Sequence, residues 1–300
     1  MEARSLIFGF SSPSLHTQKP NITFLPALLP ASTQSTTQSP KWVPLKPQFF
    51  LIPRISWAKK VSSIRAVESK SLHTHEIESS VDTQKKKKFA VFVSGGGSNF
   101  KAIHKATLQG SIQGEVVVLV TNKIDCGGAK YARDGGVPVI LFPKPKNTDE
   151  GMSPEDLVAA LRKYKVDFIL LAGYLKLIPP ALIQAYPRSI LNIHPSLLPA
   201  FGGKGYYGRK VHKAVIASGA RYSGPTIHYV DEEYDTGRIL AQAVVPVLAN
   251  DSADDLAARV LNEEHKLYVQ VAAALCEERV VWREDGVPLI QSKDNPNLYL

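Results

Sequence analysis

Short runs of apolar residues alternate with helix-like patterns through the middle of the chain. The runs span residues 88–94, 115–121, 138–142, 167–173 and 189–194, and helices are predicted from Ser98 to about Gln109, from Ser153 and from about Pro179. Strands that alternate with helices in this way form βαβ units, in which the strands are parallel. The runs are continuous rather than alternating, which predicts strands buried on both faces. The predicted fold class is therefore α/β, with a doubly wound, mainly parallel sheet.

The pattern changes after residue 208. The expected elements are a helix to Ser218, strands at 226–230 and 239–247, a helix from Asp251 to about Glu278, and a hairpin that turns at Asp285-Gly286. The two strands lie close enough in sequence to pair antiparallel. The second helix begins with acidic residues, which the positive end of a helix dipole favours, and Asp-Gly is typical of hairpin turns. Residues 87–300 are therefore expected to form a single domain.

The first 67 residues differ sharply from the rest of the chain. They contain eight Lys and Arg residues but a single acidic residue, Glu2, and they are rich in Ser, Thr and Pro. This composition, without a compact apolar segment, is typical of an organelle transit peptide, and the abundance of Ser and Thr favours the chloroplast stroma. Residues 1–66 are thus predicted to be the transit peptide and residues 67–86 a linker. The alternative is a disordered tail without a targeting role.

The leader carries most of the positive charge. Its formal charge of +7 leaves +2 of the chain's +9, so the pI of 9.4 does not indicate a nucleic-acid-binding surface. Cys126 and Cys276 show no CxxC spacing, which excludes a disulfide framework and a thiolate zinc site. The longest apolar segment, residues 168–183, contains a lysine and two prolines and is too short to span a membrane. The mature protein is expected to be soluble, with small molecules as its partners.

A glycine-rich turn, SGGGSNF at residues 94–100, directly follows the first predicted strand. Backbone N–H groups of such a turn can converge on an anion at the start of a helix, because glycine has no Cβ in the way. Phe100 stands where a dinucleotide fingerprint that starts at Gly95 needs glycine, and the Gly-Lys pair of a P-loop is absent. A small phosphate site is the functional interpretation, and a simple tight turn is the alternative.

Asn192 and His194 end the strand at 189–194. In an open α/β sheet, ligands bind beyond the carboxyl ends of the strands. Side chains two positions apart share one face of a strand, so the amide and the imidazole can address one atom. An imidazole can transfer a proton near neutral pH, and an amide N–H can stabilise an oxyanion. In the alternative interpretation, both are polar residues at a strand end that pair with nearby backbone groups.

An acidic loop lies between the strands at 226–230 and 239–247. It contains Asp231, Glu232, Glu233 and Asp235. Most such clusters are solvated, but an inward-facing Asp235 would raise the pKa of His194 and hold its ring in place. The eight histidines show no metal-ligand spacing, so no metal is expected. The absence of GxSxG disfavours a serine hydrolase of the usual type.

Four stretches together resemble the folate-dependent formyltransferases. In chain order they are SGGGSN, LLAGYLKLIP, LNIHPSLLPAF and HYVDEEYDTGRILAQ. The resemblance covers roughly residues 87–290 and is greatest to the branch of the family that formylates glycinamide ribonucleotide in purine biosynthesis. It implies a Rossmann-like formyltransferase fold for residues 87–300 and 10-formyltetrahydrofolate as the co-substrate. With the plastid-type leader, it implies a plant chloroplast form.

The resemblance also implies roles for individual residues. The matching positions are Asn192, His194 and Asp235 for catalysis, Gly97, Ser98, Asn99 and Glu264 for the ribonucleotide, and Leu175, Lys176, Leu177, Ile178, Asn192 and Asp231 for the folate. Two departures concern the surroundings of these residues. Glu150 stands where bacterial members tend to carry an arginine near the folate glutamate tail, and the loop FGGKGYYG at 201–208 differs in length from some members.

The implied mechanism is direct transfer of the formyl group. The glycinamide amine attacks the formyl carbon, and Asn192 and protonated His194 stabilise the oxyanion. Asp235 keeps His194 charged, and the amine proton leaves through His194 or a bound water. One oxyanion donor contributes about 10²–10³ in rate.

Three other functions remain open at this stage. A methionyl-tRNA formyltransferase shares the NIHPSLLP-like stretch and the distal aspartate, but it needs a C-terminal RNA-binding domain. A formyltetrahydrofolate deformylase transfers the same group to water and usually carries an N-terminal regulatory domain. A non-catalytic phosphometabolite-binding module would keep the glycine-rich turn without needing the Asn-His-Asp set. The glycine-rich turn disfavours the first two.

Overall fold

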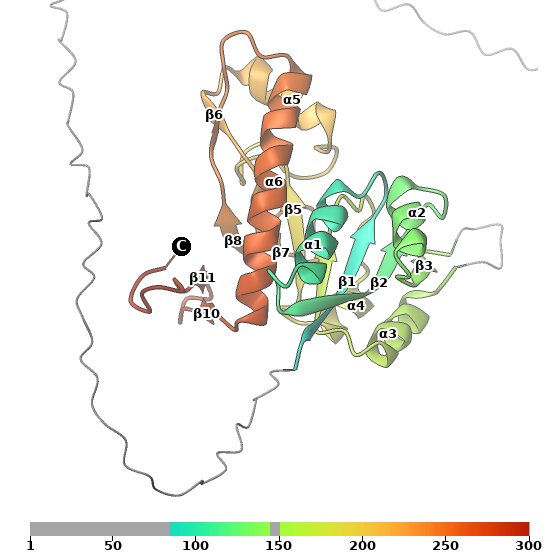
Figure 1. Cartoon of the computed structure of the whole chain (residues 1–300). Coiled ribbons are helices and arrows are strands. Elements are labelled where there is room, and N and C mark those ends of the chain that lie inside the picture. Colours follow the sequence, from blue (N-terminus) through green and yellow to red (C-terminus); the bar gives the residue numbers. More distant parts are fainter. Residues whose placement is uncertain (1–84, 145–150, 300) are drawn as a thin grey trace, which may run out of the picture. The chain divides into compact units, whose positions relative to one another are not determined.

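The computed structural model describes residues 85–144 and 151–299, and in this part of the chain a seven-stranded sheet forms the centre of the fold (Figure 1). Its strands are β1 (Lys87–Val93), β2 (Gly114–Thr121), β3 (Val139–Leu141), β4 (Phe168–Leu171), β5 (Ile190–His194), β7 (Thr226–Tyr229) and β8 (Ile239–Gln242). The predicted transit peptide, most of the linker and Glu150 lie outside the described residues.

The strands follow the order β3-β2-β1-β4-β5-β7-β8. The pairs from β3 to β5 are parallel, whereas β5 pairs with β7, and β7 with β8, in antiparallel fashion. This confirms the predicted doubly wound sheet and the antiparallel strands after it. The strand order reverses between β1 and β4, and ligands of such sheets bind beyond the carboxyl ends of the strands at this point.

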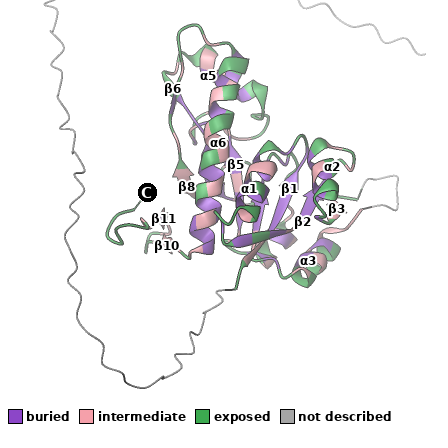
Figure 2. Cartoon of the chain, viewed as in Figure 1, coloured by how far each residue is buried: buried purple, intermediate pink, exposed green. Residues whose placement is uncertain are grey.

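Helices cover both faces of the sheet (Figure 1). The helices of the described residues are α1 (Ser98–Leu108), α2 (Gly127–Asp134), α3 (Pro154–Lys163), α4 (Pro180–Ala185), α5 (Arg209–Ser218) and α6 (Ala253–Cys276). Residues of α1, α2 and α6 pack in one apolar cluster with one face of the sheet, and residues of α3 and α4 pack in a second cluster on the other face. Figure 2 shows the resulting pattern, with buried strands between helices whose outer sides are exposed.

Strand β1 shows why the apolar runs are continuous. All five residues from Phe89 to Val93 are fully buried. Phe89, Val91 and Val93 belong to the cluster with α1 and α6, whereas Ala90 and Phe92 belong to the cluster with α3. Because alternate side chains of a strand point to opposite faces, a strand between two helical layers needs apolar residues at every position.

The helix starts follow from local capping. The Ser153 side chain accepts a hydrogen bond from the backbone N–H of Asp156, which confirms the predicted start of α3. Ser252 and Asp255 form a capping box at the start of α6. The start of α6 is therefore two residues after the predicted position. Each cap satisfies backbone donors that the helix itself leaves unpaired.

Two elements differ from the sequence prediction. The segment 239–247 is not one strand, because β8 ends at Gln242 and β9 (Val245–Pro246) pairs with β6 (Tyr222–Ser223) in a separate two-stranded sheet. The interruption falls at Ala243, whose carbonyl lies so close to Gly224, at φ 147°, that no Cβ would fit there. Helix α2 was not predicted, since it is short and begins with two glycines.

The hairpin near the C-terminus is confirmed. Strands β10 (Val280–Trp282) and β11 (Pro288–Ile290) pair antiparallel, and Gly286 in the turn has a φ of 77°. Within the ranges 85–144 and 151–299, none of the helices is long and apolar enough to cross a membrane.

Tyr268 connects α6 to the carboxyl ends of two parallel strands. Its side chain is fully buried, and its hydroxyl is shared between the carbonyl oxygens of Leu171, at 3.1 Å, and Leu191, at 3.2 Å. We expect Tyr268→Phe to lower the free energy of unfolding by about 1 kcal/mol, because it removes a buried hydrogen bond between α6 and the sheet. Urea unfolding followed by circular dichroism measures this change. Tyr222→Phe, at a side chain that is 64% exposed, is the control, and equal stability of both variants would contradict the prediction.

Candidate active site

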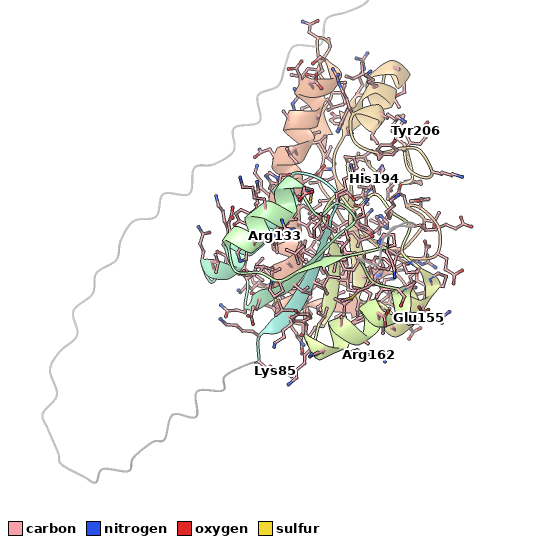
Figure 3. The ribbon with its side chains drawn as sticks, turned by 90° about the vertical axis from the view of Figure 1, so that its right-hand side faces the viewer. Lys85, Arg133, Glu155, Arg162, His194 and Tyr206 are labelled. Carbon is pink, nitrogen blue, oxygen red and sulfur yellow. The ribbon has the colours of Figure 1, made fainter. Side chains whose placement is uncertain are left out.

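A cavity of about 640 Å³ opens at the carboxyl ends of β4 and β5. It is lined by residues 173–178, 192–195 and 203–209, by His212, His228, Asp231, Tyr234 and Asp235, and by Asp254, Ala257, Leu261 and Glu264 of α6, with Asn99, Leu171, Val230 and Glu233 completing the wall. Figure 3 shows His194 far from Lys85, which precedes the first strand. The cavity thus lies where the strand order predicts a ligand site.

The structure brings Asp235 to His194, as the sequence predicts. The Nδ1 atom of His194 lies 3.3 Å from Asp235 Oδ2, and the two side chains are 4% and 10% exposed. The Nε2 atom of His194 lies 2.9 Å from the carbonyl oxygen of Phe201. Both ring nitrogens therefore face oxygen acceptors, and only the imidazolium form can donate a hydrogen bond to both.

Burial opposes this charge. Burial lowers the pKa of His194 below its usual value, although the Asp235 carboxylate and the Phe201 carbonyl act in the opposite direction. The expected upward effect of Asp235 is present, but loss of hydration has the larger effect on this pKa. Burial raises the pKa of Asp235, but its contacts with His228, His194 and the Gly203 N–H hold it below its usual value. Asp235 is therefore ionised.

The acidic loop separates into solvated and inward-facing residues. Glu232 and Glu233 are exposed, as is usual for such clusters, whereas Asp235 turns inward with a left-handed φ of 60°. The backbone N–H of Gly203 donates to Asp235 Oδ2 at 2.9 Å. Asp231 stays in the loop, where it accepts a 2.7 Å hydrogen bond from the Thr236 hydroxyl, and it lines the cavity.

A second buried histidine, which no sequence motif predicted, completes this cluster. His228 on β7 lies opposite Asn192 in the antiparallel register. The Nδ2 atom of Asn192 lies 3.1 Å from His228 Nε2 and 3.5 Å from Asp235 Oδ1. The sequence offered one indication of its role. His228 lies between the buried residues Ile227 and Tyr229, in a strand that was already expected beside the acidic loop.

The segment after His194 is fixed by Thr226. This fully buried residue accepts a hydrogen bond from the backbone N–H of Leu198 at 3.0 Å and donates one to the carbonyl oxygen of Ser196 at 2.7 Å. Gln242 of β8 donates to the same Thr226 oxygen at 2.9 Å. The antiparallel strands thus anchor the loop that leads from His194 to Phe201.

The glycine-rich turn packs against the start of α2. Gly97 has a left-handed φ of 68°, and a Cβ there would come within 2.9 Å of Gly128 Cα. The backbone N–H of Gly128 also donates to the Gly95 carbonyl at 3.0 Å. Gly97 and Ser98 lie outside the lining of the cavity, although both were predicted substrate contacts, whereas Asn99 lines it. The helix starts of α1 and α2 meet at this turn.

Asn99 connects the turn to α6. Its Nδ2 atom donates to Glu264 Oε2 at 2.7 Å, and its Oδ1 atom is buried without a partner. Burial raises the pKa of Glu264, and the hydrogen bond from Asn99 lowers it in part. The predicted ribonucleotide residues Asn99 and Glu264, which are 165 positions apart, therefore lie together in the wall of the cavity.

An apolar strip forms another part of the wall. Leu175 and Leu177 are 50% and 47% exposed, while Ile178 is buried. The backbone N–H of Leu175 donates to the buried Ser94 hydroxyl at 2.9 Å, which connects the strip to the end of β1. Lys176 is exposed between the two leucines. This strip offers apolar surface to a flat ligand.

Among residues 85–144 and 151–299, no group of three or more His, Cys, Asp or Glu side chains could hold a metal ion. The expectation that no metal takes part stays a prediction.

Comparisons with known proteins give the family. A family model described as formyl transferase matches residues 87–272. A chloroplastic phosphoribosylglycinamide formyltransferase of Vigna unguiculata is 70% identical over 244 residues, which cover 81% of this chain and 77% of that protein. Its counterpart in Arabidopsis thaliana is 64% identical over 240 residues, which cover 80% and 82% of the two chains.

Solved structures agree with this result. The crystal structure of phosphoribosylglycinamide formyltransferase from Anaplasma phagocytophilum is 31% identical, with a TM-score of 0.63, and covers 71% of this chain and 97% of that chain. The fold, the transferase activity and the chloroplast location predicted from the sequence are thereby confirmed. The chain belongs to the formyl transferase family, within its group of plant chloroplastic phosphoribosylglycinamide formyltransferases.

Proposed function

We propose that the chain transfers the formyl group of 10-formyltetrahydrofolate to the amine of glycinamide ribonucleotide, with Asn192, His194 and Asp235 as the catalytic residues. The observation that carries this proposal is the buried contact of 3.3 Å between His194 and Asp235 at the wall of the cavity. An ionised carboxylate beside an imidazole is the arrangement that acid-base catalysis needs. The Asn99–Glu264 pair in the same cavity supports a polar substrate.

The cavity offers different chemistry to the two substrates. The pterin of the folate would lie on the apolar strip at Leu175–Ile178, within reach of Asp231. The ribonucleotide would lie at Asn99 and Glu264, where the unpartnered Asn99 oxygen is a free acceptor for a hydroxyl or amide. Its phosphate would lie beside the turn at Gly97 and Ser98, at the positive end of α1. Asn192 and His194 line the same cavity.

The reaction begins with a neutral His194, because burial keeps its pKa low. The amine nitrogen attacks the formyl carbon, and an N–H of Asn192 stabilises the oxyanion that forms. His194 takes the proton that the amine nitrogen loses and becomes an imidazolium, which Asp235 stabilises at 3.3 Å. The same proton then passes to N10 of the folate as the bond between carbon and N10 breaks. The proton balance is closed, and most of the remaining rate comes from holding the two substrates together.

The loop that carries Phe201 has to move in this sequence. The Phe201 carbonyl lies 2.9 Å from His194 Nε2, the nitrogen that must reach the substrate. A neutral His194 that donates from Nδ1 to Asp235 directs the lone pair of Nε2 at that carbonyl oxygen, which is repulsive. Binding of the substrates therefore replaces the Phe201 carbonyl at this nitrogen.

The first test is turnover. The protein is mixed with 10-formyl-5,8-dideazafolate and glycinamide ribonucleotide, and loss of the formyl group is followed by absorbance. We expect His194→Ala to lower kcat by about 10²–10⁴, the usual contribution of a positioned acid-base group. His104→Ala, at a buried histidine of α1 outside the cavity, serves as the control. Turnover without the ribonucleotide would indicate a deformylase, and no turnover at all would favour a binding module.

The second test concerns the charge of His194. Burial lowers its pKa, so the ligand-free ring should titrate below the usual value of about 6.5. Since Asp235 raises this pKa, Asp235→Asn should lower it further. An NMR titration of the imidazole signals measures both values, and the His194 signal is the one absent from His194→Asn. A midpoint above the usual value in the wild type would mean that Asp235 outweighs burial.

The third test separates the two ends of the cavity. We expect Glu264→Gln to raise KM for the ribonucleotide roughly 10-fold, because a hydrogen bond to a charged group is worth about 1.5–3 kcal/mol. KM for the folate should stay unchanged. Glu263→Gln is the matched control, since Glu263 pairs with Lys266 and does not line the cavity. An equal rise in both KM values would place Glu264 outside the ribonucleotide site.

A further inference from the structure

His228 has a fixed pattern of hydrogen bonds. The residue is 2% exposed and lies on β7, directly opposite Asn192 of β5. Its Nδ1 atom lies 2.8 Å from the carbonyl oxygen of Tyr229. A carbonyl oxygen can only accept, so Nδ1 carries a hydrogen and donates it.

The other ring nitrogen must then be an acceptor. Nε2 lies 3.1 Å from Asn192 Nδ2 and 3.6 Å from Asp235 Oδ1. An N–H at Nε2 would point at the hydrogens of the Asn192 amide across the shorter of these contacts. A lone pair at Nε2 accepts from that amide instead. The two contacts together specify a neutral ring with its hydrogen on Nδ1.

The Asp235 carboxylate, which can only accept, decides independently which end of the Asn192 amide faces the cluster. The two groups nearest to its nitrogen are His228 Nε2, at 3.1 Å, and Asp235 Oδ1, at 3.5 Å. Both are acceptors, so only the NH₂ end of the amide fits there. One hydrogen is held by His228, and the second makes only a long contact to Asp235. The second hydrogen is therefore the one that can turn to an oxyanion in the cavity.

We propose that His228 is a positioning residue, which holds the Asn192 amide so that its NH₂ group, and not its carbonyl oxygen, addresses the reacting formyl group. The proposal deepens the proposed function, because it assigns the group that orients the oxyanion donor. Without an acceptor at this place, the amide can rotate by 180° and direct a carbonyl oxygen at the developing negative charge. Its effect is on the transition state rather than on substrate binding.

The tautomer can be tested without any turnover. In the ligand-free protein at pH 7.5, long-range ¹H–¹⁵N correlation spectra should show His228 with a protonated Nδ1 and an unprotonated Nε2. The His228 signal is identified as the one that is absent from the spectrum of His228→Asn. An Nε2–H tautomer or an imidazolium at this pH would overturn the proposal, whatever the enzyme catalyses.

Two amide variants test the donor Nδ1 and the acceptor Nε2 of the His228 ring separately. An Asn side chain reaches the place of Nδ1 and can still donate to the Tyr229 carbonyl, whereas a Gln side chain reaches the place of Nε2 and can accept from Asn192. We expect His228→Asn to lower kcat about 10- to 100-fold, at most the contribution of one oxyanion donor, with KM for both substrates within about 2-fold of the wild type. His228→Gln should keep kcat within about 3-fold, since it restores the hydrogen bond that orients the donor.

The controls distinguish orientation from loss of fold. His104→Asn replaces another buried imidazole by an amide, outside the cavity, and should keep kcat. In an Asn192→Ala background, His228→Asn should cost no further activity, because there is no amide left to orient. Equal losses in His228→Asn and His228→Gln, or an undiminished loss in the Asn192→Ala background, would overturn the proposal. A wild type that does not formylate the ribonucleotide would overturn the proposed function instead, and the tautomer measurement would still stand.

Discussion

The buried carboxylate of Asp235 is the interaction on which the rest of the site depends. A charge that is 10% exposed needs compensation, because the interior hydrates it poorly. Three separate segments provide it: His194 at the end of β5, the Gly203 N–H in the following loop, and the Asn192–His228 pair between β5 and β7. The carboxylate thus fixes two loops and two strands relative to one another, and the wall of the cavity consists of these segments.

The change of strand direction at β5 makes this arrangement possible. As the last parallel strand, β5 ends at the edge where α/β sheets bind ligands. As the partner of the antiparallel β7, it pairs with a distant segment, so that His228 lies opposite Asn192, which is 36 positions away. A purely parallel sheet would place a helix after β5 and give Asn192 no such partner. The return loop from β7 to β8 then brings Asp235 back to the same edge.

The sequence predicted those parts of the fold that depend on local patterns. Continuous apolar runs such as Phe89–Val93 identify strands between two layers, and Ser153 identifies a helix start. Prediction from the sequence failed where contacts between distant segments determine the structure. The expected strand at 239–247 is interrupted where Gly224 and Ala243 approach each other. His228 has no motif of its own, because its importance comes from Asn192, its partner on the neighbouring strand. The effect of burial on the pKa of His194 was missed for the same reason, since burial is a property of the whole fold.

The opposing effects on His194 explain why the proposed reaction needs both of them. Burial alone would lower its pKa until the ring could no longer take a proton from an amine. The carboxylate alone would keep the ring charged, and a charged ring cannot act as a base. With both effects present, the ring is neutral before the reaction, and the imidazolium that forms finds Asp235 already ionised at 3.3 Å. Since the acceptor is in place beforehand, little reorganisation is needed at the moment when the charge appears.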